Sequence, residues 1–154
     1  MLKWLAAIWL AIIIPFVVAG VSGGPKAPWA GTAALPLPGH AVFHIGYIVA
    51  ALFGIVLIWS FVRSTPKGVT RGLSIALIGT QLVFIAGQVG ELLVVLSHSG
   101  PRAVEDALVD PMHDIPALGG TAPGLLLSAV VLIALTVTAI VTSRRAATPA
   151  VGGQ

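Results

Sequence analysis

The feature that most constrains this chain is a set of four apolar segments, each long enough to cross a lipid bilayer. They cover residues 4–21, 41–62, 73–97 and 122–142. A transmembrane helix needs roughly 17–25 such residues to cross the hydrocarbon core. Of the 154 residues, 57% are hydrophobic and only 8% are charged, whereas a soluble domain is usually about 25% charged. The sequence therefore predicts an integral membrane protein.

Spanning segments satisfy their backbone groups as helices, because no water is available inside the bilayer. The short connections then predict an all-α four-transmembrane-helix bundle, which forms one domain over residues 1–145. The third connection, after His98, has apolar and charged residues at helical spacing, which predicts a short extracytoplasmic amphipathic helix between helices three and four. Residues 146–154 are small and polar, and we expect a disordered cytoplasmic tail there.

The lysines and arginines indicate the orientation of the bundle. Most of them lie at the two ends of the chain and in the connection 63–71, while the other two connections hold only Lys26 and Arg102. The positive-inside rule then predicts a multi-pass protein of the plasma (cytoplasmic) membrane with both termini cytoplasmic and with 22–39 and 98–121 outside. The net charge of +3 follows from this topology, so no nucleic-acid partner is predicted. The absence of cysteine excludes disulfides, thiolate metal ligands and covalent haem attachment.

One face of the third apolar segment carries a polar stripe. At about 100° per residue, Thr80, Gln81, Gln88, Glu91 and His98 fall within a sector of about 100°. A carboxylate at this depth costs roughly 2.5–3.5 kcal/mol on insertion scales unless it is paired, hydrated or protonated, and it marks a functional site by default. The stripe therefore predicts a polar site inside the bundle.

The second apolar segment carries a matching polar face in its outer half. The connection 63–71 is short, so the second and third helices should be antiparallel neighbours. Counting from this connection at equal rise per residue places His44 level with Glu91 and Tyr47 level with Gln88. The predicted topology assigns every acid and histidine to the outer half of the bundle or to the outer loops, so we expect one cluster on the extracytoplasmic side.

Imidazole and carboxylate groups together suit a divalent transition metal such as Cu, Zn or Fe. His44 and Glu91 are the principal predicted metal ligands. Tyr47 and Gln88, one turn deeper, are expected to orient them. The other predicted ligands are His40, His98, His113, Asp110 and Asp114.

Two other interpretations remain open. The first is a purely structural membrane subunit, in which His44 and Glu91 form a buried pair without a cofactor. The second is haem b held by axial histidines such as His44 and His98, which needs no covalent motif. A haem needs a wide cleft, however, and in the third segment only Gly87 and Gly90 offer space beside Glu91.

The sequence does not predict an enzyme acting on its own. It contains no Gly-rich phosphate loop, nucleophile elbow or His-Glu-x-x-His motif. A transporter is also disfavoured, because the polar stripe fades below Gln81. The expected function is that of a small polytopic membrane protein that binds a transition metal. We expect it to be an accessory subunit of a larger membrane complex, such as an oxidoreductase, with lipid and other membrane subunits as its partners.

Overall fold

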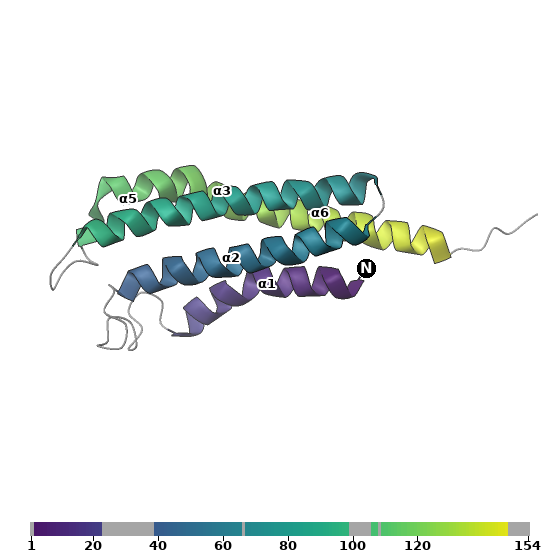
Figure 1. The fold of residues 1–154 in the computed structure, drawn as a ribbon, viewed down its shortest axis with the longest axis horizontal. Coiled ribbons are helices and arrows are strands. Elements are labelled where there is room, and N and C mark those ends of the chain that lie inside the picture. The colour runs from purple at the N-terminus through teal and green to yellow at the C-terminus, as the bar shows by residue number, and fades with distance from the viewer. Residues whose placement is uncertain (1, 23–38, 66, 99–105, 108, 148–154) are drawn as a thin grey trace, which may run out of the picture.

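The computed structural model describes residues 2–22, 39–65, 67–98, 106–107 and 109–147, and this part of the chain is almost entirely helical, without strands. The all-α prediction is confirmed. In chain order the elements are α1 (Leu2–Ser22), α2 (Gly39–Ser64), α3 (Val69–Ser97), α5 (Pro111–Pro116), the π-helical turn η2 (Ala117–Thr121) and α6 (Ala122–Ala147). The long helices run alongside one another and form an elongated bundle (Figure 1).

Helix α3 lies at the centre of the bundle. It packs against α2 on one side and against α5, η2 and α6 on the other, while α1 packs mainly against α2. Helices α2 and α3 are antiparallel neighbours joined by a short turn (Figure 1). Gly68 precedes α3 with φ 144°, a conformation that disfavours residues with a side chain. This glycine lets the chain reverse direction within a few residues.

The last helical stretch begins earlier than the sequence predicted. Elements α5, η2 and α6 follow one another without interruption, so the helix starts at Pro111 rather than near residue 122. In the π turn the N–H of Ala122 bonds to the carbonyl of Ala117, five residues back. Pro116 and Pro123 lack an N–H, and a local π turn is one way in which a membrane helix accommodates such residues.

Three helical stretches of the described chain are long and apolar enough to cross a membrane, namely His40–Ser64, Val69–Ser97 and Pro111–Arg145. Helix α1 contributes a shorter apolar stretch, Lys3–Pro15, so the fourth span stays a prediction. Large apolar side chains such as Phe53 and Leu93 are about 60% exposed on the outside of the bundle. Such a surface suits contact with lipid. Residues 23–38 of the predicted loop, most of the predicted amphipathic helix and the tail from residue 148 lie outside the described residues.

The buried residues of α3 show how the interior changes along the bundle. Leu77 belongs to an apolar cluster at the end of the bundle near the α2–α3 turn, which also contains Leu5, Ile8, Ile58, Phe61, Val62, Leu132, Leu135 and Ala139. At the opposite end Val95 packs with Ala41 and Ala107. Between them, Gln81, Gln88 and Glu91 are all buried. The polar interior is therefore enclosed between two apolar layers.

Candidate metal centre

Three histidines come together in the half of the bundle that lies away from the α2–α3 turn. His40 and His44 lie one turn apart on the same face of α2, and His113 comes from α5. One ring nitrogen from each lies within 4.8 Å of the other two. The ring centroids are 4.6 Å apart for His40 and His44, 5.6 Å for His40 and His113, and 5.9 Å for His44 and His113. We call these residues the three-histidine group.

Several nitrogens of the three-histidine group have no hydrogen bond within the described part of the chain. They are both ring nitrogens of His40, Nε2 of His44 and Nε2 of His113, and all are buried. Buried polar atoms in native proteins almost always have a partner, and an ion-binding site is one recognised explanation for those that lack one. The group therefore offers at least three nitrogens, one on each ring, to a shared ligand.

The local sequence around Asp110 explains how His113 reaches the group. Asp110 is the N-cap of α5, and its Oδ1 accepts a hydrogen bond from the Met112 N–H at 2.8 Å. Pro111 occupies the first helical position, which suits a residue without an N–H. The helix is thus started two residues before His113, and the imidazole is directed into the bundle, where it is 8% exposed.

Glycines let the π turn approach α3 closely. A Cβ added to Gly87 would overlap the backbone nitrogen of Thr121, and it would lie 2.6 Å from Thr121 Oγ1. A Cβ on Gly90 would lie 2.5 Å from Cβ of Pro116. Small residues allow this kind of close backbone approach between membrane helices. The contact brings the Thr121 hydroxyl to the buried polar residues of α3.

A hydrogen-bond network lies directly beside the three-histidine group. His44 Nδ1 is 2.9 Å from Gln88 Oε1. The Gln88 amide nitrogen is 3.0 Å from Thr121 Oγ1 and 3.4 Å from Glu91 Oε1, and the Thr121 hydroxyl also donates to Glu91 Oε1. The second oxygen of Glu91, Oε2, is 3.5 Å from His113 Nε2, an ion-pair distance without hydrogen-bond geometry. One buried carboxylate therefore contacts His113 directly and His44 through an amide.

The structure separates the other predicted ligands from the three-histidine group. His98 Nε2 is 3.5 Å from Asp110 Oδ2, and its Nδ1 is 2.9 Å from the carbonyl of Val94. These two predicted ligands thus pair with each other. Asp114 is exposed on α5 and does not belong to the group. Glu91 lies beside the group, next to His113.

The two residues expected to orient the ligands have different surroundings. Gln88 contacts His44 directly, so it lies at the depth that the sequence assigned to Glu91. The Tyr47 ring is 6.3 Å from that of Phe84, and with Gln81 it lines a small cavity of about 10 Å³. Across the α2–α3 pair, His44 therefore contacts the Gln88 amide. The Glu91 carboxylate lies on the other side of that amide.

Thr121 is the residue of the site that the sequence analysis did not identify. The sequence predicts that the segment 98–121 lies outside the membrane, and the Thr121 hydroxyl therefore does not belong to the predicted buried stripe. The signal that could have revealed it is Asp110-Pro111, a helix N-cap followed by proline at the first helical position. A helix started there would carry both His113 and Thr121 into the bundle.

The donor set restricts the ion that such a group can hold. Imidazole nitrogens suit Zn, Cu, Fe and Ni, while Mg and Ca prefer oxygen ligands. Three protein ligands leave a further coordination position open. At metal–nitrogen distances of about 2.1 Å, tetrahedral ligands are about 3.4 Å apart, so the rings would draw together on binding.

Comparison with known proteins gives no match to any family, curated protein or solved structure.

Proposed function

We propose that this protein binds a transition-metal ion at the three-histidine group, inside a helical membrane bundle. The observation that carries the proposal is the convergence of nitrogens from His40, His44 and His113 within 4.8 Å, because nitrogens of all three rings are buried without hydrogen-bond partners in the described chain. Borderline ions such as Zn²⁺, Cu²⁺ and Fe²⁺ are the class that this donor set suits.

The buried Glu91 carboxylate supports the same proposal. It is 6% exposed and is contacted by Thr121, Gln88 and His113. A carboxylate inside a membrane is unfavourable by a few kcal/mol unless it is compensated. A bound cation would be the largest local charge in the site and would supply that compensation. The Glu91 carboxylate and the histidine nitrogens without hydrogen-bond partners thus both favour a bound cation.

The packing of α3 favours a metal ion over haem b. The two glycines that the sequence offered as space for a macrocycle, Gly87 and Gly90, are in close contact with Thr121 and Pro116 of the last helical stretch. Their small size serves helix packing. A single ion needs no cleft beyond the space between the imidazole rings.

The location and the partner of the metal centre also belong to the proposal. The distribution of lysine and arginine favours an extracytoplasmic position, as described above. An accessory role in a larger membrane complex is favoured by the wide apolar surface of the bundle. Gentle purification from membranes tests this role: a stoichiometric partner is expected, and a chain that purifies alone from its native membrane would contradict it.

Metal analysis of detergent-purified protein tests the proposed function. We expect about one Zn, Cu or Fe per chain, and we expect Zn²⁺ binding to be lost in the double variant His44→Ala/His113→Ala. The matched control is His98→Ala, which removes a histidine that pairs with Asp110 outside the three-histidine group. Equal metal content in all three proteins, including none, would overturn the proposal.

A further inference from the structure

Gln88 holds a specific place between the three-histidine group and the buried carboxylate. It lies on α3 and is 3% exposed. Its side-chain oxygen faces His44 Nδ1 at 2.9 Å, and its nitrogen faces Thr121 Oγ1 and Glu91 Oε1. The amide oxygen thus has a partner on α2, and the amide nitrogen has partners on α3 and in η2.

The partners of Gln88 determine which end of its amide points towards His44. Glu91 Oε1 accepts the single proton of the Thr121 hydroxyl, which leaves the Thr121 oxygen free to act only as an acceptor. Both groups therefore present acceptors to Gln88, and the NH₂ end must face them. The oxygen end is left for His44. Reversing the amide would place its oxygen against two acceptors, which is unfavourable in a buried site.

The direction of this hydrogen bond decides the tautomer of His44. A carbonyl oxygen accepts a proton, so Nδ1 must carry the N–H, and a neutral imidazole then has its lone pair on Nε2. Nε2 is one of the buried nitrogens of the three-histidine group without a hydrogen bond. We propose that Gln88 is a positioning residue, which keeps the proton of His44 on Nδ1 and presents Nε2 as the ligand atom. This inference rests on the proposed function.

Such a role is chemically consistent with how metal sites are built. The second nitrogen of a ligating histidine usually donates to a carboxylate, carbonyl or water, and the loss of that partner typically weakens metal affinity 10–100-fold. Here the partner is an amide, which is itself held by Glu91 and Thr121. The carboxylate therefore acts on His44 through a neutral group, while it contacts His113 directly.

Nitrogen NMR of ¹⁵N-histidine-labelled protein in bilayers tests the tautomer without any metal. We expect wild-type His44 to be protonated on Nδ1, and we expect added Zn²⁺ to shift Nε2 while Nδ1 stays protonated. A wild-type His44 protonated on Nε2 would overturn the inference. This measurement on the unmodified chain does not depend on whether any variant folds.

Gln88→Met then tests the role of the amide, because methionine has a similar length and no carbonyl oxygen. The matched control is Gln81→Met, since Gln81 is equally buried on the same helix but bonds to Ser128. We expect Gln88→Met to lose the Nδ1 preference of His44 and to bind Zn²⁺ 10–100-fold more weakly, and we expect Gln81→Met to do neither.

The outcomes separate the inference from the proposed function. If wild type binds Zn²⁺ and Gln88→Met binds it equally well, the positioning role is wrong and the metal centre stands. If wild type binds no Zn²⁺, the proposed function is wrong, and the positioning role is overturned with it.

Discussion

The backbones of Gly87 and Gly120 are in direct contact: a Cβ added to Gly120 would lie 2.6 Å from the Cα of Gly87. This contact joins the π turn to α3 at the depth of the polar network. It allows Thr121 to reach Glu91 and Gln88. The geometry of the candidate site therefore depends on two residues that have no side chain.

We expect Gly87→Ala to destabilise the protein, because the added methyl group would overlap the backbone of Thr121. Overpacking of this kind typically costs about 1–3 kcal/mol. Thermal unfolding in detergent measures the change, and Zn²⁺ titration should show weaker binding. The control is Gly79→Ala on the same helix, where a Cβ meets nothing within 4 Å. Equal melting temperatures for the two variants would contradict the close contact.

Glu91→Gln should weaken metal binding while the protein stays folded. The substitution keeps the shape of the side chain but removes the negative charge beside His113. For the loss of a supporting carboxylate we expect a 10–100-fold lower Zn²⁺ affinity. The control is Asp106→Asn, which removes an exposed carboxylate and should leave the affinity unchanged. An affinity unaffected by Glu91→Gln would show that the carboxylate has only a structural role.

Substitutions at Asp110 should show how much its N-cap hydrogen bond to Met112 and its ion pair with His98 each contribute to stability. Asp110→Asn keeps an N-cap acceptor for Met112 but loses the charge that faces His98. The pair is partly exposed, and since ion pairs near the surface contribute about 0–1 kcal/mol, the free energy of unfolding of Asp110→Asn should change little. Asp110→Ala loses the cap as well, and caps are typically worth about 1 kcal/mol. Chemical unfolding of both variants measures the difference, and a larger loss in Asp110→Asn would contradict this order.

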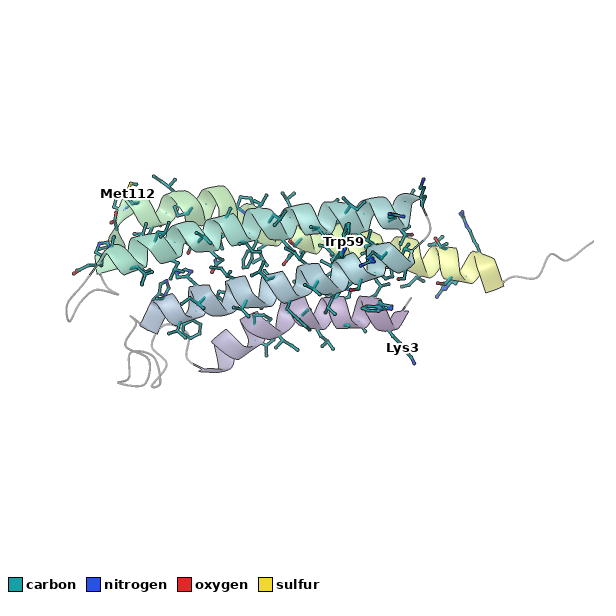
Figure 2. All side chains as sticks on the ribbon, in the orientation of Figure 1. Lys3, Trp59 and Met112 are labelled. Atoms are coloured by element: carbon teal, nitrogen blue, oxygen red, sulfur yellow. The ribbon has the colours of Figure 1, made fainter. Side chains whose placement is uncertain are left out.

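Cysteines placed at Ser64 and Met112 should be labelled from opposite sides of the membrane. Ser64 ends α2, and Met112 begins the last helical stretch at the far end of the bundle from Lys3 (Figure 2). The chain has no cysteine of its own, so each variant carries a single reactive thiol. The basic connection predicts that Ser64→Cys reacts from the cytoplasmic side. Reaction of both positions from the same side would contradict the topology.

The general fold was accessible from the sequence because apolar length alone decides it. The segments that became α2 and α3 are long and uninterrupted, and their short connection leaves only an antiparallel arrangement. The ends of these two helices were harder to predict from the sequence. Helix α2 continues to Ser64 and α3 starts at Val69, so the turn is tighter than expected and His44 lies beside Gln88. A shift of about one turn was enough to exchange Glu91 for Gln88.

The site was predictable only where helical spacing holds. His40 and His44 are one turn apart on a continuous helix, and their ring nitrogens do lie close together. His98 was assigned to the stripe by the same spacing, but α3 ends at Ser97 and His98 has extended backbone angles, φ −91° and ψ 144°. The predicted fourth span begins at residue 122, whereas the helical stretch begins at Pro111 and Gly120 serves close packing within it. Such contacts between distant segments cannot be read from local spacing.

The π turn also sets the angular phase between the two parts of the last helical stretch. A π turn holds one residue more than an α-helical turn, and one residue corresponds to a rotation of about 100°. If Ala117–Thr121 were regular α-helix instead, α5 would be rotated by about that angle relative to α6. His113 would then face away from His40 and His44. The π turn, which absorbs one extra residue, thus determines whether the third imidazole meets the other two.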